Sequence, residues 1–258
     1  MRIRFLTAGE SHGPQLTAVL EGMPAGLALD LDEINGQMAR RQKGYGSGGR
    51  MKIEKDAVQI TAGFMAGQTT GGPIAITIPN KDFAKWQNRD IPPMTIPRPG
   101  HADLTGAVKY GYRDLRLALE RASARETAVR VAVGAICQQL LAQFGVTLGS
   151  YVTSIGPISA DIPTGMSYPD RFAAAEASDV RCPIPESAQA MRQHIRAIME
   201  SKDTAGGVFE VAALGVPPGL GSHVHWDRRL DAQLMWSVGS IHATRNPRRP
   251  ERSRRRRT

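Results

Sequence analysis

The strongest constraint on the fold is a long amphipathic helix pattern in the middle of the chain, at residues 123–144. Its apolar side chains recur three or four residues apart, which is the spacing of one helix face; they are Val129, Val133, Ile136, Leu140 and Phe144. Ser123 and Glu126 form a capping box before the helix, and Gly145 ends it. A helix with this much apolar surface has to pack against other elements.

Short strands and further helices surround this pattern. Strands are expected at residues 1–7, 16–20, 58–64, 74–78 and 208–216, and further helices at residues 32–43, 186–201 and 227–238. Asp32 is the expected N-cap of the first of these helices. Strands and helices follow one another without a regular βαβ alternation, so the sequence predicts the α+β class and no doubly wound sheet.

Apolar stretches and cysteine usage indicate in which compartment the protein resides. No stretch reaches the length of about 18 apolar residues that a membrane span needs, and the first residues lack the apolar core of a signal peptide. Cys137 and Cys182 are read as reduced thiols. We therefore expect a cytoplasmic protein without membrane contact.

The net charge of +9 is concentrated at one end of the chain. Residues 245–258 hold eight arginines and one glutamate, so most of the excess positive charge lies there. Such a tail favours an alternative reading, a basic protein that binds nucleic acid. The rest of the chain is nearly neutral, and the whole chain is only 5% aromatic, so it offers no stacking surface for bases.

Two glycine-flanked turns each present a histidine. His12 lies in the run GESHG directly after a strand, and His101 lies in RPGHAD with Asp103 two residues later. A histidine in such a loop can hold a proton near neutral pH and act as a general acid. Taken singly, either histidine could equally be an ordinary turn residue.

Positive charges accompany two further segments. Arg121 and Arg125 flank the start of the long helix, where free N–H groups favour an anion such as phosphate. Arg41 and Arg50 lie beside a glycine-rich loop at residues 44–50, which raises the same possibility. The alternative at both places is a solvated charged surface. His223 and His225 lack further ligands nearby, so no metal site is expected.

Taken together, these segments resemble the chorismate synthase family. The matching runs are TAGESHG, RRQKGYGSGGR, GGPIAI, RPGHAD, KYGYRD, RASARETAVRVA, GVPPGLGS and RLDAQL, in this order along residues 1–243. The resemblance implies a single-domain sandwich of sheets and helices that assembles as a homotetramer. It also implies a lyase of the shikimate pathway for aromatic amino acids, which eliminates phosphate from 5-enolpyruvylshikimate 3-phosphate to give chorismate. That anti 1,4-elimination requires reduced FMN, with NADPH as a possible reductant.

The resemblance also assigns roles to residues of this chain. His12 is expected near the flavin, and His101 is expected to assist the departing phosphate. The FMN contacts fall on two short runs, which are Arg121, Ala122 and Ser123, and then His242 and Ala243. Arg41 matches one of two arginines assigned to the nicotinamide or a substrate anion. The second position is Ser47 here, and Arg50 is expected to compensate for it.

After Ala243 the sequence departs from the family pattern. The expected division is an incomplete catalytic domain at residues 1–243 and an arginine-rich, disordered tail at 244–258, the product of a truncated or frameshifted gene. Such a chain would fold poorly or aggregate, and its elimination activity would be weak. An inactive fragment is therefore a further alternative to the enzyme.

Overall fold

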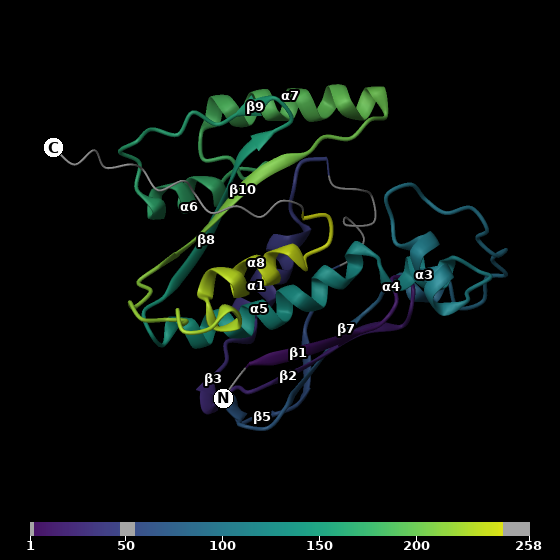
Figure 1. Cartoon of the computed structure of the whole chain (residues 1–258), viewed down its shortest axis with the longest axis horizontal. Helices are drawn as coiled ribbons and strands as arrows, with labels where there is room; N and C mark the ends of the chain where they lie inside the picture. Colours follow the sequence, from purple (N-terminus) through teal and green to yellow (C-terminus); the bar gives the residue numbers. More distant parts are fainter. Residues whose placement is uncertain (1–2, 47–54, 245–258) are drawn as a thin grey trace.

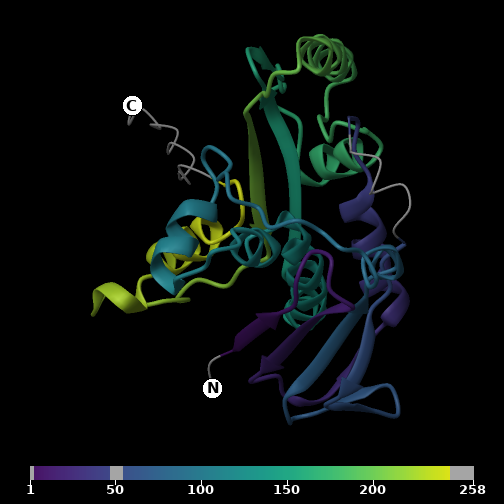
Figure 2. The same ribbon diagram turned by 90° about the vertical axis from the view of Figure 1, so that its right-hand side faces the viewer.

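The computed structural model describes residues 3–46 and 55–244, and in it the elements stack in layers (Figure 1). Its lowest layer is an antiparallel sheet of β1, β2, β7 and β4, and the helices α1 and α5 lie above that sheet. Above the helices lies a second sheet, in the order β10-β8-β9, with α6 and α7 on its far side. Figure 2 shows the same layers from the side. This mixed arrangement confirms the α+β prediction.

The bounds of the elements are as follows. The strands are β1 Arg4–Ala8, β2 Gln15–Glu21, β3 Ala25–Ala28, β4 Gln59–Ala62, β5 Phe64–Met65, β6 Gln68–Thr70, β7 Ile74–Pro79, β8 Thr147–Ile155, β9 Ile158–Ser159 and β10 Gly207–Leu214. The α-helices are α1 Leu31–Gln42, α3 Asp103–Tyr110, α4 Arg116–Arg121, α5 Thr127–Ala142, α6 Tyr168–Glu176, α7 Pro185–Ser201 and α8 Leu230–Gly239. Three short 3-10 helices are η1 Phe83–Lys85, η2 Ala124–Glu126 and η3 Trp226–Arg228.

The main core lies between the first sheet and α5. Alternate residues of β7, namely Ile74, Ile76 and Ile78, are fully buried, as period-2 patterning requires. Val129 and Ile136 of α5 are also fully buried in the same cluster. Each such side chain contributes roughly 1.5–3 kcal/mol through removal from water. The long helix that the sequence predicts therefore packs in the main core.

Two helix starts differ from the sequence prediction. The N-cap of α1 is Asp30, whose side chain accepts from the backbone N–H groups of Asp32 and Glu33, so the expected cap at Asp32 was two residues late. The long helix is also interrupted at its start. Ser123 caps the 3-10 turn η2 by accepting from the N–H of Arg125, and α5 itself begins at Thr127. The carboxylate of Glu126 makes long-range contacts instead, which are described below.

Other predicted elements are close to those observed, and some elements were not predicted. The strands predicted at 1–7, 16–20, 58–64, 74–78 and 208–216 lie within a few residues of β1, β2, β4, β7 and β10, and the helix predicted at 186–201 is α7. The predicted helix at 227–238 consists of η3 followed by α8. The elements that were not predicted include β3, β6, β8, β9, α3, α4 and α6. No helix among residues 3–46 and 55–244 is long and apolar enough to cross a membrane. Both cysteine thiols are free, and burial raises the pKa of each.

The helix α8 exposes several large apolar side chains. Leu234 and Trp236 are 55% and 72% exposed, and Leu230 and Met235 are also exposed. Apolar patches of this kind favour association. We expect the double substitution Leu234→Glu and Trp236→Glu to weaken self-association about tenfold or more, since each large side chain buried in a contact contributes roughly 1.5–3 kcal/mol. Sedimentation velocity over a concentration series measures the effect.

A matched control is available on another part of the surface. Met65 on β5 is 73% exposed, so Met65→Glu removes a comparable apolar side chain elsewhere. Equal effects of the two changes on the sedimentation profile would contradict a specific role for α8.

Candidate active site

Several predicted site residues converge on one short stretch, residues 120–127, which we call the α4–α5 junction. It contains the last residues of α4, the turn η2 and the first residue of α5. The turn between β1 and β2 lies beside it in Figure 1, at the end of α4. His12 and Arg41, both more than 80 positions earlier in the chain, form hydrogen bonds to this junction, and His242 contacts it from the C-terminal side. Residues from distant parts of the sequence therefore meet at this junction.

The turn that carries His12 is held from two sides. The Ser11 N–H donates to the backbone oxygen of Glu120 at 3.1 Å. The Ser123 hydroxyl donates to the Ser11 hydroxyl at 3.0 Å, so the predicted flavin segment and the histidine turn are in direct contact. From the other side, the Asn80 amide donates to the backbone oxygens of Ser11 and Gly13, both at 2.9 Å. The turn thus has a defined conformation.

The imidazole of His12 contacts the side chains of Glu120 and Trp86. Its Nδ1 lies 2.7 Å from Oε1 of Glu120, and its backbone N–H donates to Oε2 of the same carboxylate at 2.8 Å. The ring of Trp86 lies against the imidazole, with the ring centroids 4.1 Å apart. Neither Glu120 nor Trp86 was among the predicted site residues.

The carboxylate of Glu126 connects three elements on the other side of the junction. It accepts from the Thr7 hydroxyl at 2.8 Å, pairs with Arg121 at 3.3 Å and lies 3.2 Å from Nε2 of His242. Arg121 also donates to the backbone oxygen of Thr7. The C-terminal end of α8 is further held by Arg130, which donates to the backbone oxygen of Ser240 at 2.7 Å. His242, next to Ala243, is therefore brought to the same place as Arg121.

One nitrogen of His242 is left unsatisfied. A carboxylate only accepts hydrogen bonds, so the contact with Glu126 places the proton of a neutral His242 on Nε2. Its Nδ1 is buried and has no hydrogen-bond partner among the residues that the structure describes. Buried polar atoms of this kind are rare and call for an explanation such as a bound group. Nδ1 is thus an acceptor suited to an N–H or hydroxyl of a ligand.

Arg125 has a different role from the one expected. Its guanidinium pairs with both oxygens of Asp56, at 2.6 and 2.8 Å, and the two side chains are only 5% and 2% exposed. Arg41 approaches the same carboxylate at 3.4 Å and donates to the Thr127 hydroxyl at 3.0 Å. The charge of Arg125 is therefore neutralised within the protein, which argues against its prediction as an anion ligand. The side chain of Arg41, from α1, therefore reaches the junction at the start of α5.

His101 lies just before α3, which packs on α4. A Cβ at Gly106 would come 2.7 Å from the Cβ of Ala118, so these two helices are in very close contact. The exposed imidazole has its Nδ1 2.9 Å from the backbone oxygen of Pro99. The hydrogen bond of His101 is to Pro99, and the convergence of His101 with His12 stays a prediction.

Asp103, two residues after His101, pairs with Arg98. Its carboxylate accepts from the side chain of Arg98 at 2.8 and 2.9 Å and from the Arg98 backbone N–H at 3.1 Å. These hydrogen bonds hold the pKa of Asp103 below its ordinary value of 3.8, and they also raise the pKa of Arg98. The buried carboxylate therefore shapes the turn around His101.

A pH-dependent prediction follows from this pair. A lowered pKa in the folded state means that ionised Asp103 stabilises the fold above pH 3.8 and loses that contribution as pH falls further. Asp103→Asn should lower the free energy of unfolding by about 2 kcal/mol at pH 7, the scale of lost hydrogen bonds to a charged group. Its deficit relative to wild type should shrink by pH 3. Urea unfolding at both pH values measures this, and an equal deficit at both would contradict it.

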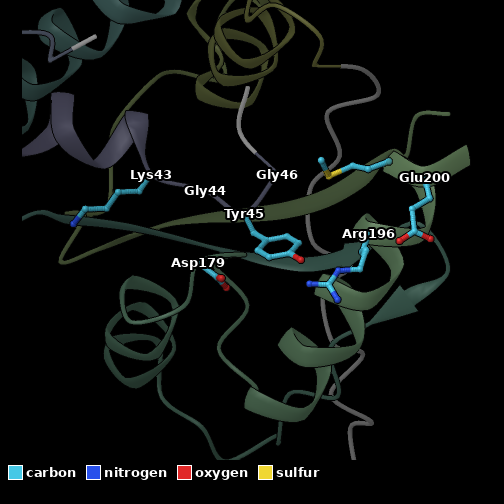
Figure 3. A pocket seen from close by; sticks show the side chains of 8 residues that line it. Lys43, Gly44, Tyr45, Gly46, Asp179, Arg196 and Glu200 are labelled. Atoms are coloured by element: carbon cyan, nitrogen blue, oxygen red, sulfur yellow. The ribbon is translucent and has the colours of Figure 1, made fainter. Parts of the chain in front are cut away.

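Some predicted positions fall elsewhere. Arg50 and Ser47, in the glycine-rich loop, and the tail at 245–258 lie outside the described residues. A hollow of about 740 Å³ between the end of α1 and α7 contains none of the predicted site residues (Figure 3). It is lined by Lys43, Gly44, Tyr45, Gly46, Asp179, Arg196, Met199 and Glu200. His225 pairs with Asp227, and no group of three or more metal-ligating side chains occurs in the described part of the chain.

The residues that the sequence analysis missed share one property. Asn80, Trp86, Glu120 and Asp56 act as partners of predicted residues across long sequence separations. Only Glu120 carried a local signal, since it directly precedes Arg121 in the predicted anion segment. The other three lie in segments without a regular pattern.

Comparisons with known proteins agree with the motifs at this junction. The family model for chorismate synthase matches residues 3–246. The chain belongs to the chorismate synthase family. Proteins named chorismate synthase from Aquifex aeolicus and Symbiobacterium thermophilum are each 50% identical to it, over 93% and 94% of this chain. A solved chorismate synthase crystal structure matches 95% of the chain with a TM-score of 0.80 and 44% identity.

The chain spans only part of these chorismate synthases. It covers 65% of the Aquifex aeolicus protein, 66% of the Symbiobacterium thermophilum protein and 67% of the chain in the crystal structure. The α+β architecture is therefore that of the family. The activity of the longer proteins is considered below as a proposal.

Proposed function

We propose that this chain acts as a chorismate synthase, which eliminates phosphate from 5-enolpyruvylshikimate 3-phosphate in the presence of reduced FMN. The observation that carries the proposal is the meeting of three predicted segments at the α4–α5 junction, in a chain of this family. The His12 turn reaches it through Ser11 and Ser123, and the end of α8 reaches it through Glu126 and His242.

The residues at the junction fit a bound flavin. Arg121, Ala122 and Ser123 would hold FMN from the junction side, and His242 with Ala243 would hold it from the end of α8. The buried Nδ1 of His242 needs a donor, and a flavin N–H or ribityl hydroxyl is one. When bound, reduced FMN supplies electron density to the substrate during the elimination. Arg41 would contribute positive charge toward a substrate anion or the nicotinamide of NADPH.

The two histidines would handle protons. His12 would maintain the protonation state next to the flavin. His101 would donate a hydrogen bond or a proton to the departing phosphate, whose negative charge grows as its C–O bond breaks. The Pro99 oxygen accepts from Nδ1 of His101, so a protonated His101 would present Nε2–H to the phosphate.

The predicted domain division, localisation and oligomeric state are part of this proposal. Residues 1–243 would form the catalytic part and residues 244–258 a basic tail, in a cytoplasmic homotetramer. The exposed apolar side chains of α8 support self-association. Nucleic-acid binding is the competing function for the tail, because its arginines can pair with phosphates. A chain that ends at residue 243 separates the two, since it should lose nucleic-acid binding and keep flavin binding.

An anaerobic assay tests the proposed function. The purified chain is mixed with 5-enolpyruvylshikimate 3-phosphate and either reduced or oxidised FMN, while phosphate release and flavin absorbance are followed. We expect phosphate release with reduced FMN only. Absence of phosphate release at high enzyme concentration, from a chain shown to be folded by circular dichroism, would overturn the proposal.

A further inference from the structure

We propose that Glu120 is a positioning residue, which holds His12 in a single tautomer and orientation so that Nε2 is the nitrogen that exchanges protons. The importance of this role for catalysis rests on the proposed function, but the tautomer itself does not. Glu120 lies at the end of α4, directly before the predicted flavin segment.

The hydrogen bonds of Glu120 determine the tautomer. Oε1 lies 2.7 Å from Nδ1 of His12, and Oε2 accepts the backbone N–H of the same residue at 2.8 Å. An ionised carboxylate has no proton to donate, so Nδ1 has to carry the hydrogen in this contact. In the neutral imidazole the lone pair is then on Nε2. This is the arrangement in which a general base is oriented by a third group.

Lower solvent exposure distinguishes the His12–Glu120 pair from an ordinary surface ion pair. His225 and Asp227 also lie 2.7 Å apart, but their side chains are 58% and 56% exposed and they are two residues apart in sequence. The side chains of His12 and Glu120 are 23% and 14% exposed, and 108 positions separate them. Exposed pairs contribute little because water screens them. The Glu120 pair is shielded and depends on the tertiary fold.

Trp86 restricts the other freedom of the imidazole, its rotation. Its ring lies against the ring of His12, and its indole N–H donates to Asp82 at 3.0 Å. Asp82 in turn follows Asn80, whose side chain contacts the His12 turn. The segment at residues 80–86 therefore packs along the turn. With one edge on Glu120 and one face on Trp86, the Nε2 edge has a fixed direction.

Nuclear magnetic resonance reads the tautomer directly. The chain is labelled with nitrogen-15 in its histidines, and long-range correlations between imidazole nitrogens and ring protons are recorded near pH 8. His12→Gln identifies the His12 signals among the six histidines. We expect the wild-type His12 to be in the Nδ1–H form. In Glu120→Gln, which keeps the shape of the side chain, we expect a substantial shift toward the Nε2–H form.

Asp227→Asn is the matched control, because it removes the carboxylate from the exposed His225 pair. It should change only the His225 signals. A wild-type His12 that is averaged or in the Nε2–H form would overturn the proposal, and so would a Glu120→Gln spectrum in which His12 is unchanged. The wild-type spectrum decides the matter even where the variant fails to fold.

Kinetics then connect the tautomer to the reaction. Glu120→Gln should lower kcat about 10- to 100-fold, the usual effect of losing a partner that orients a reacting group. The KM for 5-enolpyruvylshikimate 3-phosphate should change little. A wild-type chain with the expected tautomer but no phosphate release would overturn the proposed function alone. Active chain with the wrong tautomer would overturn the role of Glu120 alone.

Discussion

Asp56→Ala is expected to lower the free energy of unfolding by about 3–5 kcal/mol, because it removes the buried carboxylate that pairs with the guanidinium of Arg125. The two side chains are 2% and 5% exposed and share two hydrogen bonds. Arg41 also loses its contact with this carboxylate. Urea unfolding followed by circular dichroism measures the difference from wild type.

Two further variants make this prediction specific to the buried charge. Glu21→Ala removes an exposed ion pair with Arg4 and should cost less than about 1 kcal/mol. The double substitution Asp56→Leu and Arg125→Met replaces the pair with apolar groups, and it should be less destabilising than Asp56→Ala alone. An Asp56→Ala variant as stable as Glu21→Ala would show that Arg125 has another way to satisfy its charge.

His12→Ala should reduce phosphate release about 10²- to 10⁴-fold, the range usual for removing a residue that transfers protons. The substitution takes away the imidazole that Glu120 and Trp86 hold, while Ser11 and Asn80 continue to hold the turn. We therefore expect the fold to survive and kcat to fall much more than KM rises. Phosphate release under anaerobic conditions with reduced FMN gives both constants.

The control for this prediction is a histidine of the same chain that has no place at the junction. His225 is exposed and paired only with a neighbouring aspartate in the described structure. His225→Ala should leave kcat within about twofold of wild type, since surface substitutions away from special features have small effects. Loss of activity in both variants to the same degree would contradict a specific role for His12.

The sequence predicted the elements whose evidence is local. The burial of Val129 and Ile136 follows from helical spacing, and that of Ile76 follows from strand alternation. The break at the start of the long helix could not be read in this way. Ser123 and Glu126 satisfy a capping-box pattern, yet both side chains contact distant elements, Ser11 and Thr7. Ser123 keeps a local hydrogen bond from the N–H of Arg125, whereas the carboxylate of Glu126 accepts from the distant Thr7.

The same limit applies to the candidate site. Local motifs identified His12 and Arg121, because glycine turns and helix starts can be recognised along the chain, and the family resemblance identified His242. The partners of such residues could not be predicted from the sequence. Glu120 lies 108 positions from His12, and Asp56 lies 69 positions from Arg125. Whether an arginine binds a ligand or a buried carboxylate depends on a contact that only the folded chain makes.

The central claim is that the flavin binds at the α4–α5 junction. A crystal structure of the chain with FMN and 5-enolpyruvylshikimate 3-phosphate tests it most directly. We expect a flavin in contact with Ser123 and His242, with the imidazole of His12 beside it and that of His101 facing the same cleft. A flavin in the hollow beside Tyr45, or histidines on separate surfaces, would contradict it.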